Sequence, residues 1–121
     1  MKTILVVDDE PDLRELLVDV LRGEGYLMVW ASNGQAARAL LAEQAVDLVI
    51  TDTMMPGLDG VGLIRWMRAQ PELRSVPAIL ISAALRPNLD GLGHCEFMTK
   101  PFELITLLDA VTTALGQSPP Q

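Results

Sequence analysis

Five polar residues at separate points of the chain carry side chains that could together move a phosphoryl group. Three are carboxylates, Asp8, Asp9 and Asp52, and the other two are Ser82 and Lys100. Carboxylates that converge repel one another, and Mg²⁺ (or Mn²⁺) is the expected compensating ion because it prefers hard oxygen ligands. An ammonium and a hydroxyl beside such a carboxylate stabilise charge on phosphoryl oxygens. If these residues meet, the set predicts a site at which Asp52 accepts a phosphoryl group.

Asp52 stands where an apolar run leaves a predicted sheet. Residues 48–50 are rich in β-branched side chains, as a strand covered on both faces should be. Pro56 and Gly57 follow, the residue pair that a type II turn favours, and Asp59 can cap the next helix. The stretch therefore predicts a buried strand, a tight turn and a helix start, with the carboxylate at the exit of the strand.

Strand-like and helix-like segments alternate along the chain. Continuous apolar runs predict five strands, at residues 3–7, 26–31, 48–52, 76–82 and 96–99. Apolar residues at helical spacing predict helices after the first, second, third and fifth strands, and Ser32 with Gln35 has the spacing of a capping box. The alternation predicts an α/β fold, a single doubly wound parallel sheet with helices on both faces. Right-handed crossovers then bring the C-terminal ends of the strands to one edge, where such folds bind ligands.

Each candidate residue also has an ordinary explanation when it is taken alone. The acidic residues 8–10 place favourable charge at the N-terminus of a helix. Asp52 alone would be a loop residue, Ser82 a polar strand end and Lys100 a solvated charge. The joint pattern is harder to explain in this way, because it needs the right residue type at four separate strand ends.

Length and composition limit the class of protein. The chain has 121 residues, of which 50% are hydrophobic and 21% charged, which suits one globular domain. Its formal net charge of −7 disfavours direct binding to nucleic acid. The single cysteine excludes an internal disulfide and favours a reducing compartment. No apolar run approaches the roughly 20 residues that span a membrane, and the first strand leaves no room for a signal peptide, so we expect a cytoplasmic protein without membrane association.

Three segments together resemble the signature blocks of response-regulator receiver domains, namely residues 4–11, 52–60 and 100–102. The resemblance extends from about residue 3 to residue 115. It implies a flavodoxin-like fold with strand order 2-1-3-4-5 and a role in two-component phosphorelay signalling. Asp52 would take a phosphoryl group from a phosphohistidine of a partner, either a histidine kinase or a histidine phosphotransfer protein. Transfer to its own aspartate and slow hydrolysis would make the chain a signalling module rather than a multiple-turnover enzyme, and its downstream target is unknown.

The resemblance also implies a role for each residue at the metal. Asp9 would bind Mg²⁺ directly, and Asp8 would act mostly through a water molecule. Asp52 would contribute one oxygen, and the backbone carbonyl of Met54 would contribute another.

On the other side of the phosphoryl group, Lys100 would pair with one oxygen and Ser82 would hydrogen-bond another. Phe97 matches the aromatic switch position, which turns inward when Ser82 moves toward the phosphate. A core aromatic on a short strand explains Phe97 as well, and both can hold. The peptide bond between Lys100 and Pro101 is expected to be cis.

The segment between Ser82 and Lys100 departs from the family pattern, because it is about one helical turn short. It also contains Pro87, Gly91 and Gly93, which disfavour a helix. We therefore expect the usual fourth helix to be short, irregular or mobile. Because that helix commonly carries dimerisation or output in the family, we expect a monomer or a weak phosphorylation-dependent dimer. Partner contact would then rely on the first helix and the loops around the acceptor.

Two other functions stay open at this point. One is an interaction module of the same fold that is not phosphorylated, although the complete set of polar residues gives no reason to prefer it. The other is a phosphotransferase for small molecules, but such enzymes usually need a second acid two residues after the nucleophile, where this chain has Met54. In each case we expect residues 1–116 to form the domain and residues 117–121 to be a polar tail or the start of a linker.

Overall fold

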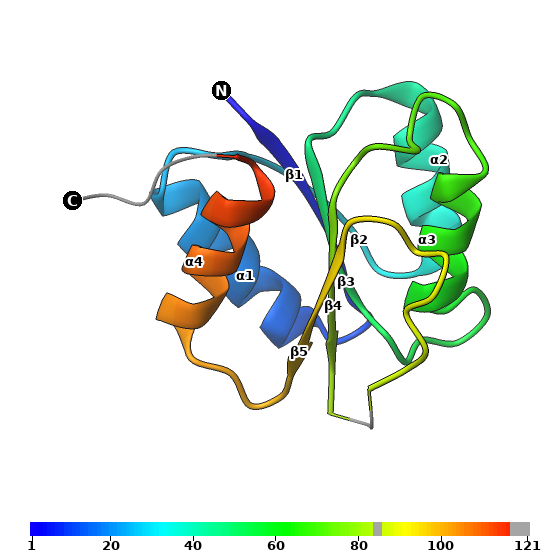
Figure 1. The fold of residues 1–121 in the computed structure, drawn as a ribbon. Coiled ribbons are helices and arrows are strands. Elements are labelled where there is room, and N and C mark those ends of the chain that lie inside the picture. Colours follow the sequence, from blue (N-terminus) through cyan, green and yellow to red (C-terminus); the bar gives the residue numbers. More distant parts are fainter. Residues whose placement is uncertain (84–85, 117–121) are drawn as a thin grey trace.

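A computed structural model describes residues 1–83 and 86–116, so the expectation for residues 117–121 lies outside the described part (Figure 1). Its parallel strands form one sheet in the order β2-β1-β3-β4-β5, which confirms the predicted fold. The strands are β1 (Thr3–Val7), β2 (Leu27–Ala31), β3 (Leu48–Asp52), β4 (Ala78–Ser82) and β5 (Cys95–Thr99). The helices of the described residues are α1 (Pro11–Gly23), α2 (Gly34–Glu43), α3 (Gly60–Arg68) and α4 (Leu104–Ala114).

Helices cover both faces of the sheet. α1 and α4 lie on one face, and α2 and α3 lie on the other (Figure 1). Alternate residues of β1 contribute to two cores, since Ile4 and Val6 pack on the side of α1 and α4 whereas Leu5 and Val7 pack on the opposite side. Because both faces are covered, β3 and β4 are buried at every position and consist of nearly continuous apolar runs. Within the described ranges, none of the helices combines the length and apolar character needed to cross a membrane.

The parallel register brings four strand ends to one edge of the sheet. β1 pairs with β3, so Asp8, which follows β1, lies next to Asp52 at the end of β3. β3 pairs with β4, which ends at Ser82, and β4 pairs with β5, which Lys100 follows. The Lys100 N–H donates to the Ser82 carbonyl at 2.9 Å. The strand order therefore positions these four residues along a single edge.

No helix forms between β4 and β5 in the described residues 86–94, in agreement with the predicted short or irregular fourth helix. Gly91 and Gly93 have positive φ angles of 78° and 66°, which a right-handed helix does not contain. Leu92 is nevertheless completely buried and belongs to the core on the side of α2 and α3. The segment therefore packs against the domain without regular structure, and Figure 1 shows it passing beside α3.

The start of α2 corrects one prediction. The sequence predicts a capping box from Ser32 and Gln35, but the structure has Asn33 as the N-cap. The Asn33 side-chain oxygen accepts a hydrogen bond from the Ala36 N–H at 2.8 Å. Asparagine is among the strongest N-caps, so it competes well with the serine before it, and the helix begins one residue later than the box would place it.

Replacing Asn33 with alanine is expected to lower the free energy of unfolding by about 1 kcal/mol, because the Ala36 N–H loses its acceptor. Ser32→Ala is the matched control and is expected to change that free energy by less than about 0.5 kcal/mol. Urea unfolding followed by circular dichroism measures both values. Equal losses in the two variants would contradict the assignment of Asn33 as the cap.

Candidate functional site

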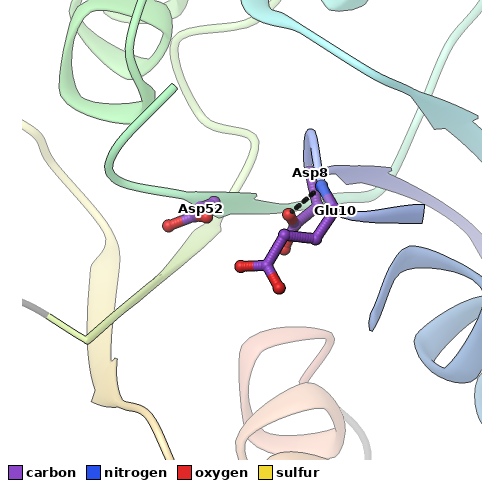
Figure 2. Close-up of side chains that lie close together, drawn as sticks. All are labelled: Asp8, Glu10 and Asp52. Atoms are coloured by element: carbon purple, nitrogen blue, oxygen red, sulfur yellow. Dashed lines mark hydrogen bonds between the residues drawn. The ribbon is translucent and has the colours of Figure 1, made fainter. Parts of the chain in front are cut away.

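Three carboxylates lie together at the edge where the strands end (Figure 2). Asp8 follows β1, Glu10 is the N-cap of α1, and Asp52 ends β3. One carboxylate oxygen from each residue lies within 4.8 Å of the others. The Asp8 carboxylate also accepts the Glu10 N–H at 2.9 Å, which fixes the turn between β1 and α1 (Figure 2). Asp8 and Asp52 are buried and Glu10 is exposed, so the group extends from the sheet to the surface.

The ammonium of Lys100 faces the same three carboxylates. Its Nζ lies 3.2 Å from an oxygen of Asp52, 3.4 Å from one of Glu10 and 3.8 Å from one of Asp8. Burial alone would lower the pKa of Lys100, but Asp8 and the hydrogen bond to Asp52 outweigh it and raise that pKa above its ordinary value. Lys100 therefore remains charged at neutral pH and points its charge at the Asp52 carboxylate.

The charges of this group do not balance. Three carboxyl groups face the single ammonium of Lys100, so acidic groups outnumber the basic one within this cluster. Burial raises the pKa of Asp8 above its ordinary value of 3.8, although the Glu10 N–H and Lys100 oppose the shift. A divalent cation would supply the missing positive charge, and carboxylate oxygens are the ligands that Mg²⁺ and Mn²⁺ prefer. The residues present therefore fit a metal ion held by Asp8, Glu10 and Asp52.

The group opens to solvent through a hollow of about 480 Å³. The hollow is lined by Asp9, Glu10, Asp52, Met54, Ser82, Ala83 and Lys100. Ser82 is completely buried, whereas Met54 is 65% exposed, so the hollow reaches from the end of β4 to the surface. The small side chain of Ala83 lines the hollow beside Ser82.

Glu10 is the residue of this site that the sequence analysis missed, because it was considered only as a favourable charge at a helix start. Its side chain makes no cap hydrogen bond on α1, which leaves the carboxylate free to face Lys100. Asp9 is exposed and lines the hollow, but in the described residues the group of approaching carboxylates contains Glu10 and not Asp9. The signal in the sequence is the two-residue spacing from Asp8, whose side chain closes an Asx-type turn on the Glu10 N–H.

The other predicted residues lie on the neighbouring loop and strand. The Met54 N–H donates to Asp52 Oδ1 at 3.3 Å, and the Met54 carbonyl stays a predicted metal ligand. Phe97, in the middle of β5, is half-buried and packs against the core on the side of α2 and α3. Its switch role stays a prediction. The peptide bond between Lys100 and Pro101 is cis, as predicted.

A close approach at the start of α3 fixes the loop that follows Asp52. A Cβ on Gly60 would lie 2.2 Å from the Asp52 carbonyl oxygen and 3.0 Å from the Leu80 side chain. The Gly60 N–H donates to the Thr53 carbonyl at 3.1 Å, and the Asp59 side chain caps α3 as predicted. Glycine at this position therefore lets α3 begin directly against β3, the strand that ends at Asp52.

Replacing Asp8 with asparagine is expected to raise the unfolding temperature of the metal-free protein at neutral pH. The folded pKa of Asp8 lies above its ordinary value, so the folded protein holds this proton more tightly than the unfolded chain does. The contribution of Asp8 to the free energy of unfolding therefore falls as the pH rises from 3.8 through the folded pKa. Asparagine carries no charge, so it removes the free-energy cost of burying an ionised carboxylate. Its side-chain oxygen can still accept the Glu10 N–H. The gain should shrink in acid, where Asp8 is protonated.

Asp12→Asn is the matched control, because Asp12 lies in the first turn of α1 outside the carboxylate group. Loss of the Asp12 charge should lower the free energy of unfolding by about 0.3–1 kcal/mol, since a negative charge near a helix N-terminus stabilises the helix. Calorimetry of both variants in EDTA measures the effect. Destabilisation by Asp8→Asn at neutral pH would contradict the uncompensated charge at this site.

Comparison with known proteins assigns the family. Residues 4–112 match the family model of the response regulator receiver domain. The chain is 35% identical to the phosphate regulon transcriptional regulatory protein PhoB of Pseudomonas aeruginosa, over 95% of this chain and 53% of that protein. The chain therefore belongs to the response regulator receiver domain family of two-component systems. It spans about half the length of the first curated relatives that it matches.

Solved structures share the fold. The signal receiver domain of a signal transduction histidine kinase from Syntrophus aciditrophicus is 35% identical with a TM-score of 0.87, and the match covers 96% of this chain and 91% of that one. The response regulator protein TrrA of Thermotoga maritima, solved in complex with Mg²⁺-BeF, is 36% identical with a TM-score of 0.84, over 95% of this chain and all (100%) of that one. TrrA has also been solved in complex with the histidine kinase ThkA.

Proposed function

We propose that this receiver domain takes a phosphoryl group from a partner's phosphohistidine onto Asp52 and changes conformation to signal. The observation that carries the proposal is the Lys100 ammonium, 3.2 Å from an Asp52 oxygen beside an open hollow. A phosphoryl acceptor needs positive charge near the phosphoryl oxygens and access for the donor, and this site offers both. The uncompensated charge of the carboxylate group supports a bound Mg²⁺ (or Mn²⁺) at the same place.

In the proposed transfer, an oxygen of Asp52 attacks the phosphorus of the phosphohistidine. A P–O bond forms while the P–N bond breaks, and the imidazole leaves with the electron pair of that bond and takes up a proton. Lys100 and the Ser82 hydroxyl hold the phosphoryl oxygens and stabilise their charge. A bound metal ion would further neutralise charge on these oxygens. Asp8 and Asp52 would hold that ion together with Asp9, as the family resemblance implies, or with Glu10, which approaches them in this structure.

The product would be an acyl phosphate on the protein's own side chain, so we do not propose a multiple-turnover enzyme. The hollow is open beside Ala83, and water that enters it would remove the phosphoryl group and reset the domain. Met54 lines the rim of the hollow with a side chain that is neither acid nor base. Without a general base at this position, hydrolysis is expected to be slow.

The proposed partner is a histidine kinase or a histidine phosphotransfer protein that contacts the starts of α1 and α4. These helices begin just after Glu10 and shortly after Lys100, so both flank the site. Ile105, the second residue of α4, is 67% exposed and Leu16, in the middle of α1, is 47% exposed, although both are large apolar side chains. Apolar residues that stay exposed beside a reactive site suit a transient protein contact. The complex of TrrA with a histidine kinase supports this choice of partner.

Incubation with acetyl phosphate tests the acceptor role without a kinase. Wild-type protein with Mg²⁺ is expected to gain one phosphoryl group by intact mass spectrometry, and EDTA should prevent the gain. Asp52→Asn should show no gain. The matched control is Asp59→Asn, which alters an exposed carboxylate of the next loop, preserves the cap of α3, and should react at the wild-type rate. Folded wild-type protein that never gains the group would overturn the reaction with small donors and favour the interaction module.

A further inference from the structure

Arg68, the last residue of α3, donates hydrogen bonds to five backbone carbonyls. The acceptors are the carbonyls of Leu73, Arg74, Val76, Leu92 and His94. The shared donor Nη1 lies 2.6 Å from the Val76 oxygen, and Nη2 lies 3.1 Å from the His94 oxygen. The acceptors belong to two segments, the turn before β4 and the stretch before β5. One side chain therefore joins α3 to the beginnings of both strands.

The surroundings of Arg68 make it a strong anchor. The guanidinium is half-buried, and burial lowers the pKa of Arg68, although Cys95 opposes the shift. An arginine still stays charged, because its pKa in water lies above about 12. A charge that is partly removed from water is stable only when its N–H groups are paired, and here all three nitrogens donate. Hydrogen bonds from a charged donor are also stronger than neutral ones.

The segment that Arg68 holds has no helix of its own. Residues 86–94 contain a turn, in which the Leu92 N–H donates to the Leu89 carbonyl at 3.1 Å, and the carbonyls of Leu92 and His94 accept from Arg68 on α3. Leu89 and Leu92 pack into the same core as Phe97, the predicted switch residue. Arg65, one turn earlier on α3, adds a single bond to this segment at 3.5 Å. Arg68 therefore provides most of the polar contact between the segment and α3.

Arg68 also acts at the end of the strands opposite the phosphoryl site. The His94 carbonyl that it contacts accepts the Ala78 N–H as well, at 3.0 Å, where β4 and β5 begin to pair. At the other end of the same strands, the Lys100 N–H donates to the Ser82 carbonyl. Arg68 therefore contacts the place where β4 and β5 begin to pair. Ser82 and Lys100, two predicted site residues, join the same strands where they end.

We propose that Arg68 is a positioning residue for signal output, which holds residues 86–94 against α3 in place of a helix and so couples this segment to Phe97. The coupling to phosphorylation rests on the proposed function, whereas the anchoring does not. Without Arg68, the carbonyls of Leu92 and His94 would lose their charged donors, and the segment would be held mainly by the apolar contacts of Leu89 and Leu92. A conformational change at Ser82 and Phe97 would then no longer be transmitted to residues 86–94, because this segment would be less ordered.

Hydrogen exchange of residues 86–94 tests the anchoring in the unphosphorylated protein. Arg68→Gln is expected to accelerate exchange in this segment about tenfold or more, because the two charged hydrogen bonds to the Leu92 and His94 carbonyls are lost. Arg65→Gln is the matched control, since it removes an arginine of the same helix that makes one long bond to the same segment. Its effect should stay below about threefold.

The coupling is tested with the same variants after treatment with acetyl phosphate and Mg²⁺. All of them should gain one phosphoryl group, because neither arginine lines the hollow. Exchange of residues 86–94 should then differ between the phosphorylated and unphosphorylated forms of wild type and of Arg65→Gln. In Arg68→Gln this difference should be absent, because the segment is no longer held against α3.

Two glycine variants in the segment itself test the contact with Arg68 independently of any change to Arg68. Gly91 and Gly93 both have positive φ angles, so alanine strains the backbone at both positions. A Cβ on Gly93 would lie 2.9 Å from Arg68 Nε, whereas a Cβ on Gly91 would meet only Arg65, at 3.8 Å. Gly93→Ala should therefore reproduce the fast exchange of Arg68→Gln, and Gly91→Ala should reproduce it much less.

Wild-type exchange rates in Arg68→Gln would overturn the anchoring, as would an equal acceleration in every segment, which would indicate a general loss of stability. A phosphorylation-dependent change that persists in Arg68→Gln would overturn the coupling. If wild type and all variants fail to gain a phosphoryl group, the coupling is lost together with the proposed function. Exchange of the unphosphorylated proteins then still decides whether Arg68 anchors the segment.

Discussion

Replacing Lys100 with methionine is expected to slow phosphoryl gain from acetyl phosphate about 10²–10³-fold, the usual effect of removing one group that stabilises developing charge. The Lys100 ammonium lies 3.2 Å from an Asp52 oxygen and borders the hollow through which we propose that the donor enters. Methionine retains the apolar stem and removes only the charged end. The rate is measured by intact mass spectrometry over time at saturating Mg²⁺.

Lys2→Met is the control for this experiment. Lys2 is exposed and precedes β1, at the opposite end of that strand from Asp8, so its charge does not face the hollow. The control should react at the wild-type rate, which would show that the general loss of one positive charge is harmless. A Lys100→Met protein that folds and reacts as fast as wild type would remove the basis for the phosphoryl site proposed here.

Replacing Gly60 with alanine is expected to lower the free energy of unfolding by about 2–3 kcal/mol, near the upper end for an overpacked site. The added Cβ would lie 2.2 Å from the Asp52 carbonyl oxygen, which belongs to the backbone of a buried strand and cannot move aside like a flexible side chain. α3 would have to shift away from β3, and the loop that carries Met54 would shift with it. Urea unfolding gives the stability, and acetyl phosphate treatment gives the effect on the site.

Gly23→Ala is the matched control for this prediction. Gly23 is the last residue of α1, and a Cβ there would meet nothing within 4 Å. Alanine should therefore stabilise the protein by about 0.5–1 kcal/mol, because glycine is the poorer helix residue. Similar stability changes in both variants would show that the close approach of α3 to Asp52 is not a constraint.

The fold and most of the residues at the sheet edge were predictable, because they depend on patterns that are local in the sequence. Residues 48–50 are apolar and a carboxylate follows at residue 52, and the structure confirms a strand that ends at Asp52. The same reasoning located Ser82 and Lys100 at strand ends. Parallel strands with short connections then leave one edge at which these ends meet, so a one-dimensional pattern is enough to bring distant residues together.

Other features depend on where single side chains point, which periodicity does not determine. Glu10 joins the carboxylates because Asp8 accepts its N–H and Lys100 attracts its side chain. Asn33 caps α2 in place of the serine before it, because its oxygen reaches the free N–H. Arg68 is one of several arginines in the sequence, and only the folded chain shows that two separate segments place their carbonyls around it.

Whether Asp52 is the phosphoryl acceptor of a metal site is decided most directly by a crystal structure of the protein with Mg²⁺ and beryllofluoride. We expect beryllium on an Asp52 oxygen, fluoride beside the Lys100 ammonium, and Mg²⁺ bound by Asp52 together with carboxylates of the turn between β1 and α1. The same structure would show whether Asp9, as the family resemblance implies, or Glu10 is the closer ligand. Beryllofluoride on a different carboxylate, or a metal ion bound away from Asp52, would contradict the proposed site.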